Sequence, residues 1–138
     1  MMSAIIDGHT HIGLQTFLEK PIPDEKLQRP AFQDRMENSI ESLIEAMDVN
    51  AVDRAVTFGY PLEEVDRVCA NNYVLQAHRA HPSRIIPFAL VDDNVDYWLK
   101  QGVQGFKQQN MLYAPECFDL PRAYQIMAEA GIPMLILK

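Results

Sequence analysis

The sequence of 138 residues predicts an α/β fold built on a parallel sheet. Short apolar segments alternate with longer segments whose apolar residues recur every three or four positions, which is the pattern of strands separated by helices. One apolar run, Ile85–Val91, is nearly continuous, as expected for a strand buried on both faces. Strands joined by helical crossovers pair in parallel, so we expect repeated βα units.

Each expected element has its own signals in the chain. Pro82 ends a helix because the residue before a proline is pushed out of the helical region, and Pro121 and Gly131 suit the start and end of another. Pro87 removes one hydrogen-bond donor from its strand. We expect strands at Ala4–Asp7, Arg54–Phe58, Ile85–Val91, Gly105–Lys107 and Pro133–Leu137. We expect helices at Asp34–Met47, Leu62–Ala80, Asn94–Gln101 and Pro121–Ala130.

The second helix is expected to bury one side. We expect Asn71 to point outward and Cys69 to lie on the buried side as a small apolar residue. The full inner stripe expected for this helix is Val65, Val68, Cys69, Asn72 and Leu75. Neither Cys69 nor Cys117 belongs to a CxxC pattern, so a thiolate zinc site is not indicated.

Length and charge exclude several classes of protein. The length suits one domain, residues 1–138. The net charge of −7 without a basic cluster argues against nucleic acid as a partner. There is no apolar run long enough for a membrane span and no signal peptide at the N-terminus. We therefore expect a cytoplasmic protein that binds neither nucleic acid nor membrane.

The segment Asp7-Gly8-His9-Thr10-His11 carries the clearest chemical signal. It follows a short apolar run, and side chains in a strand alternate between faces, so His9 and His11 should share a face with Asp7. Two imidazoles at this spacing suit one divalent metal ion. Zinc is the preferred ion, and manganese is the alternative. A plain reading, in which both histidines only bond to backbone, stays open.

Three segments resemble the amidohydrolase superfamily, in the branch of pyrone-dicarboxylate lactonases and aminocarboxymuconate-semialdehyde-type decarboxylases. They are Ile5–Gly13, Val52–Gly59 and Asn72–Ala89, with a weaker match at Gly102–Lys107. The resemblance implies the first half of a (β/α)8 TIM barrel, four βα units and a fifth strand, with His9 and His11 as metal ligands. A closed barrel takes about 250 residues, so the later ligands of the family are missing.

The resemblance also singles out residues around the metal. Lys107 is either a metal-bridging ligand, a substrate-orienting cation or an ordinary solvated lysine. Tyr60 either lines a pocket or is simply packed. Lys20 and Arg29, in the long Gly13–Phe32 connection, either meet an anionic substrate or are solvated. Leu137 takes the register at which the family usually has a histidine.

Three functions follow as expectations. The first is a metal-dependent hydrolase acting on a small, carboxylated substrate, with a non-oxidative decarboxylase of the same superfamily as its variant. The second is an inactive half-barrel that oligomerises or binds a partner, because half a barrel leaves two open sheet edges. The third is a non-metal enzyme on a doubly wound sheet. We expect a homo-oligomer, unless a shortened reading frame explains the missing half.

Overall fold

The computed structural model describes residues 3–13, 18–28, 38–109 and 118–137. Within these residues the strands are β1 (Ile6–His11), β2 (Arg54–Phe58), β3 (Ile85–Leu90), β4 (Gly105–Gln109) and β5 (Met134–Leu137). The helices are α1 (Asp24–Leu27), α2 (Ile40–Val49), α3 (Arg67–Ala80), α4 (Val95–Gln101) and α5 (Leu120–Ala130). None of the described helices is long and apolar enough to cross a membrane.

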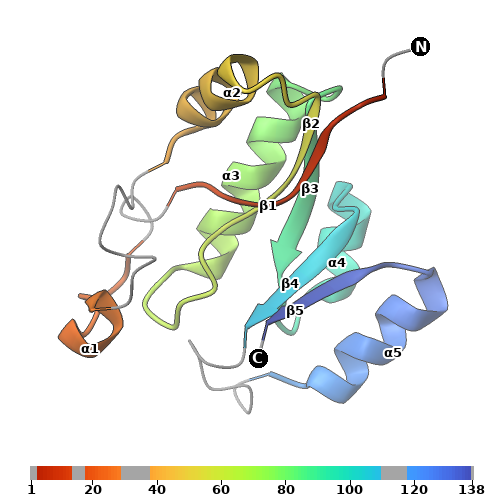
Figure 1. The fold of residues 1–138 in the computed structure, drawn as a ribbon. Helices are drawn as coiled ribbons and strands as arrows, with labels where there is room; N and C mark the ends of the chain where they lie inside the picture. The colour runs from red at the N-terminus through yellow and green to blue at the C-terminus, as the bar shows by residue number, and fades with distance from the viewer. Residues whose placement is uncertain (1–2, 14–17, 29–37, 110–117, 138) are drawn as a thin grey trace.

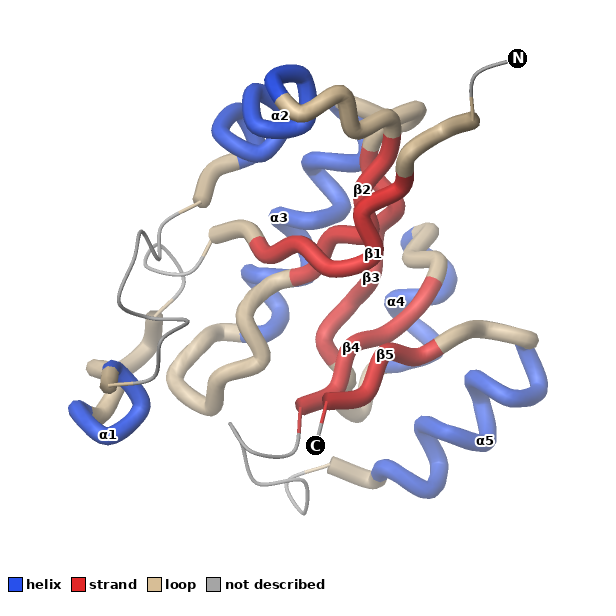
Figure 2. The backbone as a smooth tube through the Cα atoms, viewed as in Figure 1, coloured by secondary structure: helices blue, strands red, loops and turns tan. Residues whose placement is uncertain are grey.

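The five strands form one parallel sheet in chain order, β1-β2-β3-β4-β5. Figure 1 shows that the sheet is curled, and Figure 2 shows the helices arranged around it. An unbroken chain order belongs to a barrel, whereas a doubly wound sheet reverses its order at a switch point. The structure therefore confirms the first half of a (β/α)8 barrel, with β1 and β5 at the two ends of the sheet.

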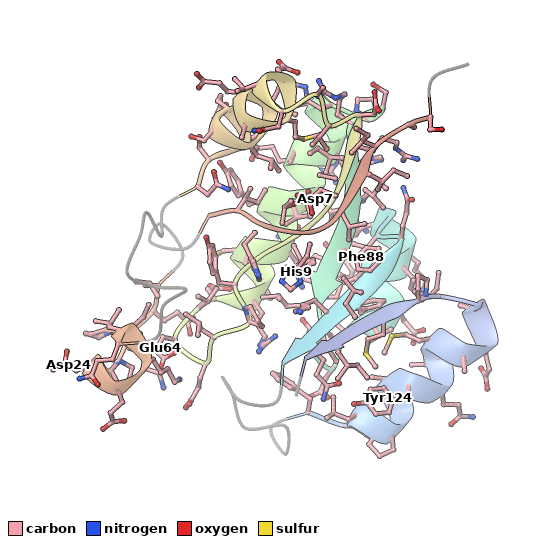
Figure 3. The ribbon with its side chains drawn as sticks, viewed as in Figure 1. Asp7, His9, Asp24, Glu64, Phe88 and Tyr124 are labelled. Carbon is pink, nitrogen blue, oxygen red and sulfur yellow. The ribbon has the colours of Figure 1, made fainter. Side chains whose placement is uncertain are left out.

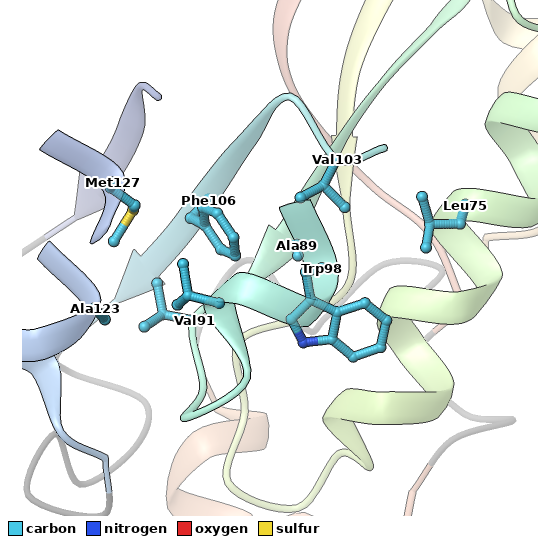
Figure 4. Packing of buried hydrophobic residues seen from close by; sticks show 9 residues of the cluster. Leu75, Ala89, Val91, Trp98, Val103, Phe106, Ala123 and Met127 are labelled. Carbon is cyan, nitrogen blue, oxygen red and sulfur yellow. The ribbon is translucent and has the colours of Figure 1, made fainter. Parts of the chain in front are cut away.

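Apolar side chains between the sheet and the helices hold the half-barrel together. Trp98 of α4 and Phe106 of β4 are buried in one cluster with Met127 of α5, which Figure 4 shows from close by. The indole Nε1 of Trp98 donates to the Asp92 carboxylate at 2.9 Å, so this buried polar group is satisfied. A second cluster packs α2 and α3 against β1–β3 through residues that include Ile12, Leu43, Val74 and Ile85.

The inner face expected for the second helix is wrong at Val68, Cys69 and Asn72, which are all exposed. It is correct at Val65 and Leu75, which are buried. The helix α3 begins at Arg67, because Asp66 caps its N-terminus and accepts a hydrogen bond from the backbone N–H of Cys69 at 3.0 Å. Cys69 is exposed and Asn71 is buried. Asn71 donates to the carbonyl of Leu90 at 3.2 Å and accepts from its N–H at 2.7 Å. A polar residue is buried here because it satisfies the backbone at the end of β3.

Several strand boundaries also differ from the expectation, whereas Pro87 does not interrupt its strand. β1 extends to His11, so the histidines lie within the strand and not beyond it. β4 extends to Gln109. Pro87 stays in β3 opposite Thr57, and its carbonyl accepts from the N–H of Gln104 at 2.8 Å. The helix α2 begins at Ile40 behind a Ser39 cap, and residues 34–37 of the expected helix lie outside the described residues.

Close packing inside the curl makes Gly105 a sensitive position. A Cβ on Gly105 would lie 2.3 Å from Cζ of Phe88, the residue opposite it on β3. We expect Gly105→Ala to lower the free energy of unfolding by about 1–3 kcal/mol, because the buried Phe88 ring has to shift. Urea unfolding measures this. Gly8→Ala is the control, since a Cβ there meets no atom within 4 Å, and equal loss in both variants would contradict the prediction.

Candidate metal centre

A β-bulge in β1 sets the directions of the side chains at this site. Asp7 pairs with Ala55 of β2 and Thr10 pairs with Thr57, so β1 holds one extra residue between them. His11 pairs with Phe58. Ala55 and Phe58 are three positions apart and face opposite sides of the sheet, so Asp7 does not share the face of His11. The expected common face of Asp7 and the histidines is therefore wrong, and Figure 3 shows Asp7 and His9 at separate places along the strand.

His9 and His11 lie close together near the C-terminal end of β1. Their Nε2 atoms are 3.1 Å apart, and the centroids of their rings are 5.0 Å apart. His11 Nδ1 lies 3.0 Å from the carbonyl oxygen of Gly59. Burial lowers the pKa of His11 to about 4, so this ring is neutral at neutral pH. Burial also lowers the pKa of His9, and the charge of Lys107 adds to that effect. Neutral imidazole is the form that binds metal ions.

The pair fits a metal ion that would bind through both Nε2 atoms. Two nitrogens, each about 2.0–2.1 Å from a tetrahedral zinc ion, lie about 3.3 Å apart. The observed 3.1 Å requires an adjustment of only a few tenths of an ångström. The remaining nitrogen of His11 faces a carbonyl oxygen, which is the outer contact that metal-binding histidines usually make. The donor types and their spacing therefore suit zinc.

No third ligand stands beside the pair in the described part of the chain. Among residues 3–13, 18–28, 38–109 and 118–137, no three His, Cys, Asp or Glu side chains are grouped closely enough to hold a metal ion. The Asp7 carboxylate accepts the backbone N–H of His9 at 3.0 Å and stabilises the bulge. His78 and His81 belong to the far end of α3. Arg29 lies outside the described residues.

Lys107 is buried on β4, with no solvent exposure, so it is not a solvated lysine. Its Nζ lies 5.1 Å from the centroid of the Phe58 ring, and that ring contacts both histidines with centroid distances of 5.1 and 4.6 Å. Among the described residues, Nζ has no hydrogen-bond partner. Burial lowers the pKa of Lys107 to about 8. An ammonium group is thus held near the histidine pair without a counter-ion from the described chain.

Tyr60 packs directly on the site. Its ring stacks on the ring of His11, with a centroid distance of 4.7 Å and an interplanar angle of 22°. Tyr60 also packs against the small cluster that contains Leu62, Val65 and Ile22.

The described part of the long connection between β1 and α2 packs on that same cluster, and Lys26 pairs with Glu64 at 2.7 Å. Lys20 pairs with Glu63 at 3.1 Å on the surface, which ties it to the β2–α3 connection.

Two supporting contacts were missed in the sequence. The Gly59 carbonyl that lies 3.0 Å from His11 Nδ1 comes from the segment Gly59-Tyr60-Pro61 directly after β2, where glycine and proline indicate only a turn. Thr10 Oγ1 donates to the carbonyl of Val56 at 2.8 Å and lies 2.9 Å from Thr57 Oγ1. The available signal was one threonine inside the HxH segment and another, Thr57, in the next strand, because Thr–Thr pairs commonly bond across strands.

No known family model matches the sequence, and no curated protein matches it. Solved structures do match. The chain is similar to a probable 2-pyrone-4,6-dicarboxylic acid hydrolase from Acinetobacter baumannii with citric acid bound, with a TM-score of 0.68 and 15% identity over 97% of this chain and 49% of that one. It is similar to an uncharacterized TIM-barrel protein from Bordetella bronchiseptica, with a TM-score of 0.62 and 16% identity over 97% and 55%.

A third similar structure is 4-oxalomesaconate hydratase from Rhodopseudomonas palustris, with a TM-score of 0.53 and 14% identity over 96% of this chain and 51% of that one. The chain therefore spans about half the length of the structures it matches. At these identities the likeness defines the fold, which is that of TIM-barrel proteins. Of the structures named here, one is called a probable hydrolase and one a hydratase.

Proposed function

We propose that this chain is the first half of a metal-dependent hydrolase barrel of the amidohydrolase superfamily. The observation that carries the proposal is the convergence of His9 Nε2 and His11 Nε2, 3.1 Å apart, on the first strand of a half-barrel. The site lies toward the C-terminal end of β1, which is the end where TIM-barrel enzymes place their chemistry. Further support comes from the similar solved structures, one a probable hydrolase and one a hydratase.

In this proposal His9 and His11 hold a divalent ion, with zinc preferred and manganese as the alternative. Such an ion supplies a water of lowered pKa and a Lewis acid for a carbonyl or carboxylate group. His11 stays neutral and keeps its Nε2 lone pair available, since its Nδ1 faces the Gly59 carbonyl. Further ligands have to come from outside the described residues, because these provide only the pair.

We propose a small, carboxylated substrate. Lys107 places a buried ammonium group near the histidines, and a buried cation without a counter-ion favours an anionic group beside it. Phe58 forms one apolar wall, since its ring lies between Lys107 and the two histidines. Lys107 then orients the substrate, while the alternative role as a metal-bridging ligand requires covalent modification of its Nζ.

Assays with a panel of small lactones that carry a carboxylate test this proposal. The zinc-loaded chain is expected to release one proton per lactone opened, with no carbon dioxide. Release of carbon dioxide from carboxylated ring substrates would instead favour the decarboxylase of the same superfamily. If zinc binds and neither product forms with any member of the panel, the hydrolase proposal fails for this chain.

A second candidate is a half-barrel that acts by association with another copy. It is favoured by the exposed apolar side chains on the two outermost strands, Ile6 of β1 at 53% exposure and Ile136 of β5 at 49%. Unpaired sheet edges that carry apolar residues promote pairing with another chain. We expect self-association that does not depend on metal. Light scattering during gel filtration measures it, and a monomer at all concentrations would contradict this candidate.

A further inference from the structure

Residues 18–28, here called the strap, include the single turn of α1 and lie against the connection between β2 and α3. Three apolar side chains of the strap, Leu18, Ile22 and Leu27, pack on the small cluster that contains Leu62. Leu62 has no solvent exposure in this arrangement. The strap therefore covers apolar side chains of the β2–α3 connection.

Few backbone contacts hold the strap in place. Among the described residues, one backbone hydrogen bond joins it to the rest of the chain, from the N–H of Glu19 to the carbonyl of Glu64 at 2.8 Å. α1 has four residues, and none of them is buried. A segment with few buried contacts and few backbone bonds to its neighbours opens locally at low cost in free energy. The strap is therefore suited to opening as a unit.

A buried ion pair fastens the strap. Lys26 Nζ lies 2.7 and 3.0 Å from the two carboxylate oxygens of Glu64. The side chain of Glu64 is only 3% exposed, and Figure 3 shows it beside α1. In the part of the chain that the structure describes, Lys26 is the one cation within ion-pair distance of this carboxylate. A buried charge that loses its partner is costly, so removal of Lys26 favours an open strap, in which water reaches Glu64.

A second ion pair of the strap differs in its exposure. Lys20 Nζ lies 3.1 Å from the Glu63 carboxylate, and the two side chains are 54% and 51% exposed. Exposed ion pairs contribute little to stability, because water solvates both charges when the pair separates. We therefore expect the Lys26–Glu64 pair, and not the Lys20–Glu63 pair, to keep the strap closed.

Tyr60 connects the strap to the histidine pair. It packs on the same cluster as the strap, and its ring stacks on the ring of His11 with a centroid distance of 4.7 Å. The carbonyl of Tyr60 also accepts from the N–H of Leu62 at 2.8 Å. Opening of the strap would therefore remove part of the packing that holds the Tyr60 ring against His11.

We propose that residues 18–28 form a strap that opens and closes over the β2–α3 connection, with the Lys26–Glu64 ion pair as its clasp, and that closure fixes the Tyr60 ring against His11. That closure regulates the candidate site rests on the proposed function. The clasp itself acts in the chain without metal or substrate, so it is tested separately.

Hydrogen exchange of the metal-free chain, followed by NMR at single amides, tests the clasp. The Glu19 amide reports on the strap through its bond to the Glu64 carbonyl, and the Leu90 amide, bonded to Asn71 at 2.7 Å, reports on the core. In Lys26→Met the Glu19 amide is expected to exchange on the order of 100-fold faster, with the Leu90 amide unchanged. An unchanged Glu19 amide, or equal acceleration at Leu90, would overturn the proposal.

Two further variants separate the clasp from general packing. Lys20→Met removes the exposed pair and is expected to change exchange of the Glu19 amide by less than about fivefold. The double variant Lys26→Met/Glu64→Leu replaces the buried pair by apolar side chains and is expected to restore slow exchange, because such replacements are often neutral or stabilising. If Lys20→Met and Lys26→Met accelerate the Glu19 amide equally, the buried pair is not the clasp.

Fluorine NMR of the metal-free chain labelled with fluorotyrosine tests the link to the site. The Tyr60 signal, assigned with Tyr60→Phe, is expected to change in Lys26→Met and to return in the double variant. A Tyr60 signal that stays the same while the Glu19 amide opens would overturn the link between strap and site. Both measurements need no metal, so a chain that fails to bind zinc or to open lactones counts against the proposed function alone.

Discussion

Zinc uptake by the chain is expected to disappear in His11→Ala. The substitution removes one of the two converging Nε2 atoms, and a single exposed histidine does not retain zinc. The loss of zinc affinity should be larger than the loss of about 10–100-fold that follows when an outer contact of a metal ligand is removed. Elemental analysis of protein purified without chelator or histidine tag measures the metal content, and the secondary structure by circular dichroism shows that the variant is folded.

His81→Ala is the matched control for this experiment. His81 follows the last turn of α3, and its backbone N–H completes the helix by bonding the carbonyl of Ala77 at 2.9 Å. This bond survives the substitution, so the zinc content should equal that of the unmodified chain. Unchanged zinc in His11→Ala, or equal loss in both variants, would remove the basis for a centre at the His9–His11 pair.

Lys107→Met is expected to increase the free energy of unfolding by about 2 kcal/mol near neutral pH. Lys107 has no solvent exposure and, in the described part of the chain, its Nζ has no hydrogen-bond partner. Methionine has a similar length and no charge, so it fills the same space beside Phe58 without the cost of a buried ammonium group. A gain in stability at a cost in function is characteristic of site residues.

The gain should depend on pH in a defined direction. Burial lowers the pKa of Lys107 in the folded protein to about 8, against 10.5 for an ordinary lysine. Between these values the unfolded chain binds more protons than the folded chain, so the stability of the unmodified protein rises with pH in this window. The advantage of Lys107→Met is therefore complete below pH 8 and fades toward pH 10.5.

Urea unfolding at several pH values measures this dependence. Lys100→Met is the control, because Lys100 is exposed at the end of α4 and should show no comparable gain. If Lys107→Met is less stable than the unmodified protein at neutral pH, the ammonium group of Lys107 is paired in solution. That result would contradict the role of Lys107 as an unpaired cation that binds an anionic substrate.

The sequence predicted the strand order because its signals are local and repeat. Apolar runs such as Ile85–Leu90, with turn residues between them, define βα units, and such units pair in parallel. The buried face of α3 was not predictable in this way. The first turn of α3 depends on the Asp66 cap. Asn71 is buried because it bonds the carbonyl and the N–H of Leu90, which is 19 residues further along the chain.

The candidate site could be predicted only in part, because some of its features have local signals in the sequence and others depend on remote residues. His9 and His11 are two positions apart, so their meeting follows from the period of a strand. The bulge that turns Asp7 away depends on pairing with Ala55 and Thr57, which are remote in sequence. The burial of Lys107 and the bond from His11 to Gly59 likewise depend on how distant strands curl together, and neither has a local signal.

The metal content of the unmodified chain tests the central claim most directly. Protein purified without chelator or tag, and then reconstituted with zinc or manganese and dialysed, should hold close to one ion per chain. Such a result means that the pair of histidines has found its further ligands. A chain that is folded and holds no ion after reconstitution would contradict the metal centre and would leave association through the open sheet edges as the better account.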